Sequence, residues 1–118
     1  MIKIRRESPH QGFHLTFANG WTLSVQTGTG NYHDGRAKYP SYDASLCDES
    51  PNAEIAVWHR NNNLVQWADG DTVQGWVSPD RIARVIAYIS NLPDSASAWG
   101  SGSTYMWLGI NGKEEMIP

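Results

Sequence analysis

The sequence predicts an α+β protein: an antiparallel sheet of about five strands, a hairpin plus a meander, with one amphipathic helix packed on one face. Two observations carry this prediction. Runs of alternating apolar and polar residues flank Asn19-Gly20, which is the pattern of a β-hairpin with one buried face. Further along, Ser78-Pro79-Asp80 opens a run whose apolar residues recur at helical spacing. A chain of 118 residues is expected to form a single domain, residues 1–118.

The hairpin is predicted over residues 13–17 and 21–26. Asn-Gly supplies the positive φ angles that a tight hairpin turn needs. The residues expected to share its buried face are Phe13, Leu15, Phe17, Trp21, Leu23 and Val25. Ile2 and Ile4 are expected to add an edge strand.

Residues 27–52 show neither helical nor strand periodicity and are rich in Gly, Tyr, Ser, Asp and Pro. A loop of this length inside a compact domain is uncommon and is often either functional or partly disordered. We therefore expect functional residues to concentrate in it.

The remaining strands are predicted at residues 53–60, 64–68 and 72–77, joined by turns to form a meander. The helix is expected from Ser78 to Leu92, with Ser78 as its N-cap and Pro93 ending it. Its apolar stripe comprises Ile82, Val85, Ile86 and Ile89. After it, residues 93–103 resemble a linker of small residues, and a last strand is expected at residues 104–110.

Composition excludes several classes of function. A net charge of −3 and a pI near 5.7 argue against a protein that coats nucleic acid. Cys47 is the sole cysteine, so it forms neither an internal disulfide nor a cysteine zinc site, and neither metal nor cofactor is expected. With no apolar run of signal-peptide or membrane-spanning length, we expect a cytoplasmic protein with no membrane partner.

Aromatic residues suggest a contact surface. The chain has six Trp and five Tyr, and these residue types are enriched at interaction hot spots. Strand alternation puts Trp58 opposite Ile55 and Val57, and Trp76 opposite Val73 and Val77. Some indoles should therefore lie on the sheet face away from the helix, either as a second small core or as an aromatic platform.

The candidate binding residues come from this platform and from the long loop. They are Gly28, Gly30, Tyr32, His33, Asp34, Arg36, Lys38, Tyr39, Tyr42 and Trp76.

Three uses of these residues are considered. In the first, the aromatic residues of the loop bind a partner protein. In the second, Gly28 and Gly30 amides bind the phosphate of a nucleotide signal, Tyr32 or Trp76 stacks on its base, and Arg36 or Lys38 supplies charge.

The third use is catalysis by His33, Asp34 or Cys47. No catalytic signature surrounds these residues. We therefore expect a binding protein rather than an enzyme, and a homodimer is left open.

Two stretches of the chain resemble small uncharacterised proteins encoded by bacteriophages and prophages. They are the hairpin with its continuation, residues 17–32, and the strand-to-helix junction, residues 73–80. The resemblance covers about a fifth of the chain and implies an accessory protein that acts in the host cytoplasm. Such proteins bind and block a host component, including defence effectors, as anti-CRISPR inhibitors do.

Overall fold

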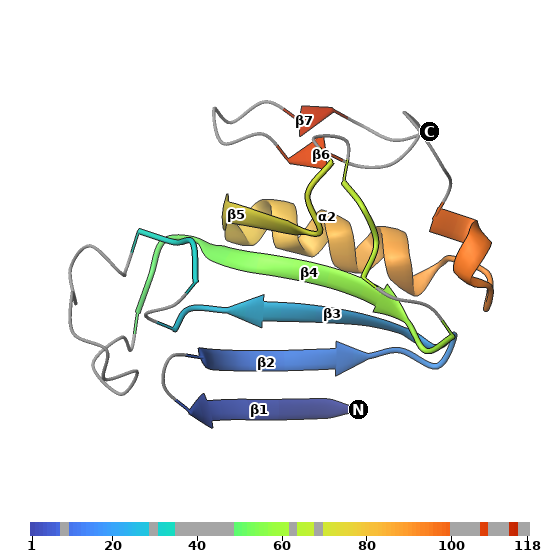
Figure 1. Cartoon of the computed structure of the whole chain (residues 1–118), viewed down its shortest axis with the longest axis horizontal. Coiled ribbons are helices and arrows are strands. Elements are labelled where there is room, and N and C mark those ends of the chain that lie inside the picture. The colour runs from blue at the N-terminus through green and yellow to red at the C-terminus, as the bar shows by residue number, and fades with distance from the viewer. Residues whose placement is uncertain are drawn as a thin grey trace.

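The computed structural model describes residues 1–7, 10–28, 31–34, 49–61, 64–67, 70–99, 107–108 and 114–115. Five antiparallel strands form one open sheet, and the α-helix found among these residues lies across one of its faces (Figure 1). The sheet follows the chain in the order β1 (Ile2–Glu7), β2 (His10–Thr16), β3 (Trp21–Gln26), β4 (Ala53–His59) and β5 (Val73–Val77). The predicted α+β class is confirmed.

The predicted hairpin is formed by β2 and β3. Phe13 pairs with Val25 and Leu15 pairs with Leu23. Gly20 has φ 86°, a left-handed conformation that glycine adopts without steric cost. The expected edge strand is also present, since β1 pairs with β2 and places Ile4 opposite Phe13.

The core lies between the sheet and α2 (Pro79–Ser90). Alternate residues of β3 and β4 point towards the helix, which brings their large apolar side chains together. Val85 and Ile89 of α2 are fully buried against them. The buried apolar residues of β3 and β4 are Trp21, Leu23, Val25, Ala53, Ile55 and Val57.

The helix begins as its sequence predicts. The Ser78 side chain accepts a hydrogen bond from the Arg81 amide, and Pro79 occupies the first turn, where no amide hydrogen is required. The far end of α2 is tied to the hairpin turn by Asn19. The Nδ2 of Asn19 donates to the carbonyls of Ile89 and Leu92, each at 2.8 Å. Two segments about seventy residues apart in sequence are thereby fixed together.

One predicted strand is absent: Leu64 forms an isolated bridge with Trp58, but residues 64–67 are not a strand, and β5 pairs directly with β4. The segment instead buries Val65 and Trp67 in the core. The Trp67 ring meets Trp99 edge-on, with ring centroids 5.2 Å apart. Burying these two side chains satisfies the apolar pattern that had predicted a strand.

The stretch predicted as a linker contributes to the core. It contains the 3-10 helix η2 (Ala96–Trp99), and Trp99 is 4% exposed. Beyond it, β6 (Trp107–Leu108) pairs with β7 (Glu114–Glu115) in a separate two-stranded sheet. The strand expected at 104–110 is thus seen at two residues, and the rest of that range lies outside the described residues.

The helix does not cover the whole sheet. In Figure 1, α2 lies alongside β4 and β5, whereas β1 and β2 form the opposite side of the sheet. Ile2 and Ile4 are accordingly 70% and 62% exposed. Within the described part of the chain, no helix is long and apolar enough to cross a membrane.

Candidate functional site

A short turn follows β3 and carries several of the predicted site residues. Asn31 holds it to the end of the strand. The side-chain Oδ1 of Asn31 accepts a hydrogen bond from the backbone amide of Gly28 at 3.0 Å, and the backbone amide of Asn31 donates to the Gly28 carbonyl at 3.0 Å. This is the local turn chemistry for which asparagine is favoured. Asn31 is 3% exposed, so the turn is packed against the protein rather than extended into solvent.

Side chains at the start of β4 fix the same turn from the other side. The carboxylate of Glu54 accepts from Nδ2 of Asn31 and from the Tyr32 amide, each at 3.0 Å. Asn52 pairs with Asp34 twice: Oδ1 accepts from the Asp34 amide, and Nδ2 donates to the Asp34 carboxylate, both at 2.7 Å. The turn is therefore held by residues about twenty positions further along the chain.

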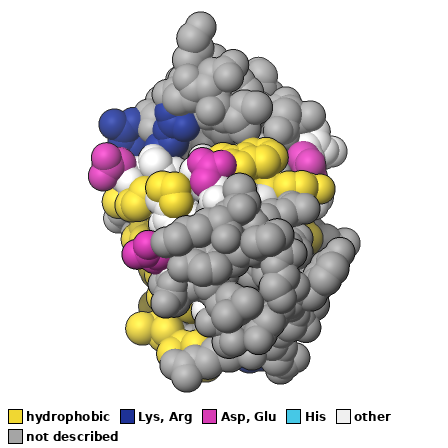
Figure 2. Space-filling view, turned by 90° about the vertical axis from the view of Figure 1, so that its left-hand side faces the viewer, with side chains coloured by type: hydrophobic (Ala, Val, Ile, Leu, Met, Phe, Trp, Pro, Cys, Tyr) yellow, Lys and Arg dark blue, Asp and Glu magenta, His cyan; other side chains and the backbone are white. Residues whose placement is uncertain are grey.

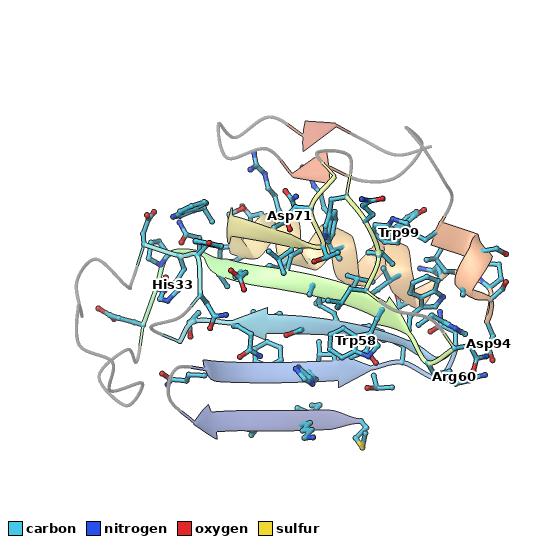
Figure 3. All side chains as sticks on the ribbon, in the orientation of Figure 1. His33, Trp58, Arg60, Asp71, Asp94 and Trp99 are labelled. Carbon is cyan, nitrogen blue, oxygen red and sulfur yellow. The ribbon has the colours of Figure 1, made fainter. Side chains whose placement is uncertain are left out.

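His33 is buried beneath the turn, at 2% exposed. The Gly28 carbonyl, 2.8 Å from Nε2, can only accept, so Nε2 carries a hydrogen. Nδ1 lies 3.1 Å from Oγ of Ser50. Both ring nitrogens are thus engaged in holding the turn. Figure 3 shows His33 at the end of the sheet opposite Arg60 and Asp94.

Tyr32 projects from this turn and packs against Trp76 of β5. The ring centroids are 5.5 Å apart with an interplanar angle of 32°. Tyr32 is 47% exposed and Trp76 is 40% exposed, so the two rings form a half-exposed aromatic pair. In Figure 2, hydrophobic and acidic side chains lie side by side on the end of the molecule that carries His33 in Figure 3.

A β-bulge sets the position of Trp76. Ala53 pairs with Val77 and Ile55 with Gln74, so two residues of β5, Gly75 and Trp76, face one residue of β4. Trp76 has φ 55°, the left-handed region, and is the non-glycine residue with positive φ among those the structure describes. Its amide donates to the carbonyl of Tyr32 at 2.9 Å instead of to β4.

Glycine is required beside the pair. A Cβ on Gly75 would lie 2.6 Å from the Cβ of Tyr32, closer than real side chains approach. The absence of a side chain at position 75 therefore lets the Tyr32 turn lie directly on β5. Three features, the bulge, Gly75 and the Glu54 carboxylate, together fix the aromatic pair.

The structure brings five of the ten predicted residues into one region: Gly28, Tyr32, His33, Asp34 and Trp76. The other five, Gly30, Arg36, Lys38, Tyr39 and Tyr42, lie outside the described residues, as does Cys47.

The predicted residues in this region make hydrogen bonds within the protein. The Gly28 amide donates to Oδ1 of Asn31. His33 and Asp34 are engaged with Gly28, Ser50 and Asn52, as structural residues of a turn would be.

Sequence reasoning missed the residues that build the region, namely Asn31, Ser50, Asn52 and Glu54. One signal was available for Asn31, since asparagine next to glycine favours a side-chain-capped turn. A second was the charged Glu54 inside an otherwise apolar strand pattern, which calls for a hydrogen-bonding partner.

A second polar cluster lies at the other end of β4. Nδ1 of buried His59 accepts from the Asn61 amide, so Nε2 carries the hydrogen that it donates to Asp94 at 2.8 Å. Arg60 also pairs with Asp94. The hydrogen bond from His59 lowers the pKa of Asp94, and the Arg60 contact lowers it further. Desolvation acts in the opposite direction, but the pKa stays below its ordinary value. The cluster ties the segment after α2 to the end of β4.

Trp58 lies on the sheet face away from α2, as strand alternation predicts, and meets His14 edge-on with ring centroids 5.1 Å apart. Among the described residues there is no group of three or more His, Cys, Asp or Glu side chains arranged to hold a metal ion.

Comparisons with known proteins found no match for this chain. No protein-family model matches the chain, no curated protein matches it, and no solved structure matches its fold.

Proposed function

We propose that this is a small binding protein that acts by occupying a partner protein, with the Tyr32–Trp76 aromatic pair at the centre of the contact. The observation that carries the proposal is the backbone of Trp76. A left-handed conformation costs an L-residue about 1–2 kcal/mol relative to glycine, and bulky side chains seldom adopt it. Strain of this kind concentrates at binding and catalytic sites.

The bulge explains why the Trp76 side chain leaves the regular pattern of β5. Bulges occur next to functional sites because they redirect a side chain out of its strand pattern. Here the bulge brings the Trp76 indole beside Tyr32 and leaves it 40% exposed. A tryptophan selected for packing alone would gain more by full burial.

The pair is also preorganised. Tyr32 is fixed through its amide by Glu54 and through its carbonyl by Trp76. A partner that binds the two rings therefore pays little conformational entropy to order them. Rigid Tyr and Trp side chains of this kind dominate the energetics of many protein interfaces.

The proposed partner is a component of a host cell, such as a defence effector, which the protein would block. The resemblance of residues 17–32 and 73–80 to small phage-encoded accessory proteins supports this choice, as does the half-exposed aromatic contact that Tyr32 and Trp76 offer.

Binding of a nucleotide signal is less well supported. The two rings are in direct contact at 5.5 Å, a spacing typical of an aromatic pair, so a base cannot enter between them. A base would have to stack on an outer ring face. The Gly28 amide, expected to hold its phosphate, already binds Asn31.

The test is co-purification of a host protein by the wild-type chain, Tyr32→Ala and Trp76→Gly, with Leu64→Ala as the control. Leu64 is 43% exposed and bridges Trp58, whereas Tyr32 is held at Glu54 near the other end of β4. The loss of Leu64 therefore removes a comparable exposed apolar group at another place. We expect one host protein to be retained by the wild type and Leu64→Ala and lost by the other two variants. Equal retention by all four proteins would refute the proposed site.

A thermal-shift panel of nucleotides and cyclic dinucleotides tests the alternative, in which the protein binds a nucleotide signal. Ligand at a hundred times its Kd stabilises a protein by about 2.7 kcal/mol, which raises Tm by several degrees in a domain of this size. A shift that Trp76→Gly abolishes would favour the nucleotide-binding alternative over a protein partner.

A further inference from the structure

A pocket of about 360 Å³ lies between the sheet and the first half of α2. Its floor is formed by the sheet side chains Phe13, Val25 and Ala53, and its roof by Ile82, Ala83 and Ile86 of α2. Neither Tyr32 nor Trp76 is among its lining residues, so it is distinct from the aromatic pair.

The pocket exists because the helix and the sheet contribute small residues at this point. The small residue of the sheet is Ala53, at the start of β4, and the small residue of the helix is Ala83, which lies above it on α2. A larger side chain at either position would fill part of the space. The fully buried residues of α2, Val85 and Ile89, close the gap further along the helix.

The volume is that of a small-molecule site. Ligand pockets commonly measure about 300–1,000 Å³. An engineered apolar cavity of about 150 Å³ stays dry and binds benzene, so by the same ratio a pocket of 360 Å³ holds up to roughly fourteen non-hydrogen atoms. That is too small for a peptide helix and large enough for a medium alkyl chain or two fused rings.

The lining indicates a ligand without charge. None of the described residues that line the pocket is charged. Two of its polar residues, Ser50 and Asn52, already hydrogen-bond the turn through His33 and Asp34. Thr27 supplies a further hydroxyl. A charged ligand would lose its hydration with no opposite charge among these residues to replace it.

We propose that this pocket binds a neutral hydrophobic small molecule of up to roughly fourteen non-hydrogen atoms, with at most one hydroxyl-sized polar group at the Thr27 end. The alkyl or ring portion would displace water from the surfaces of Phe13, Val25, Ile82 and Ile86. The pocket includes neither ring of the proposed protein contact, although Ser50 and Asn52 line it and also hold the Tyr32 turn.

The test uses 1-octanol as the neutral probe and octanoate as its charged counterpart, titrated into the full chain with ¹³C-labelled methyl groups. We expect saturable shifts of the Val25, Ile82 and Ile86 methyl signals with 1-octanol, and binding at least tenfold weaker with octanoate.

A matched pair of variants then fixes the location. Ala83 and Ala87 are both exposed on α2, but Ala83 lines the pocket and Ala87 is not among its lining residues. Ala83→Phe should weaken 1-octanol binding at least tenfold, and Ala87→Phe should leave it unchanged.

Three results would overturn the proposal. They are methyl shifts that fail to saturate, octanoate binding as tight as 1-octanol, and Ala83→Phe binding as well as Ala87→Phe. The shift pattern of the unliganded variants shows whether each is folded, so loss of binding is distinguished from loss of structure.

Discussion

Two substitutions at Trp76 test whether its backbone is strained: Trp76→Gly and Trp76→Ala. Both remove the contact with Tyr32, which is worth about 0.5–1.5 kcal/mol for an aromatic pair. They differ in the backbone. At φ 55° alanine bears a cost of about 1–2 kcal/mol that glycine avoids, while the greater freedom of glycine in the unfolded chain offsets about 0.5–1 kcal/mol.

We therefore expect Trp76→Gly to be the more stable of the two by roughly 0.5–1 kcal/mol. In an ordinary strand the order is reversed, because glycine in a strand interior is destabilising by about 0.5–1 kcal/mol relative to alanine. The two outcomes thus differ in sign, and their separation of about 1–2 kcal/mol exceeds the error of a stability comparison.

The measurement is urea unfolding followed by far-UV circular dichroism, comparing midpoints of variants that share one m value. Lys3 provides the control, since it is exposed on β1 and does not have a positive φ. There Lys3→Ala should be more stable than Lys3→Gly. If Trp76→Ala equals or exceeds Trp76→Gly in stability, the inference of a strained, redirected tryptophan is wrong.

Three further predictions concern stability. Asn19→Ala removes two hydrogen bonds to the carbonyls of Ile89 and Leu92 and one from the Trp21 amide, and should lower the free energy of unfolding in urea by about 2–3 kcal/mol. As a control, Asn91→Ala loses one exposed hydrogen bond and should lower it by under about 1 kcal/mol. Because the folded pKa of Asp94 is lowered, its stabilisation is present above the ordinary carboxyl pKa and is lost as the pH falls through the folded value. The stability difference between wild type and Asp94→Asn, measured by unfolding at pH 7 and pH 3, should therefore shrink at the lower pH. Gly75→Ala should destabilise by about 1–3 kcal/mol, because the new Cβ meets that of Tyr32; near-UV circular dichroism should report the displaced aromatic pair, and an unchanged spectrum with unchanged stability would contradict the close approach.

The parts of the fold that could be predicted are those with local signals. The alternation around Asn19-Gly20 specifies a hairpin because strand period and turn residues agree. Ser78 and Pro79 specify a helix start because the first turn needs a side-chain acceptor and spares an amide hydrogen. The strand predicted at residues 64–68 is wrong over its described part, residues 64–67, because alternating apolar residues also fit a segment that buries two side chains in the core.

The candidate site was predictable in its residue types and unpredictable in its assembly. Tyr32 and Trp76 stand out in sequence as aromatic residues outside the expected core. Their contact depends on a bulge opposite Glu54 and on a turn held from residues 50–54. These interactions join segments far apart in sequence, and no local period or motif encodes them.

The order of the strands has a consequence for how the molecule assembles. Every neighbouring pair in the sheet is adjacent along the chain, and the β1–β2 and β2–β3 pairings close loops of only a few residues, which lose little entropy. The longest connection is that between β3 and β4, which are separated by residues 27–52. The pairing of these two strands delivers Ser50, Asn52 and Glu54 to the turn that positions Tyr32. Closing the centre of the sheet therefore also brings together the residues that hold the Tyr32 turn, and opening the β3–β4 pairing would release that turn from Glu54.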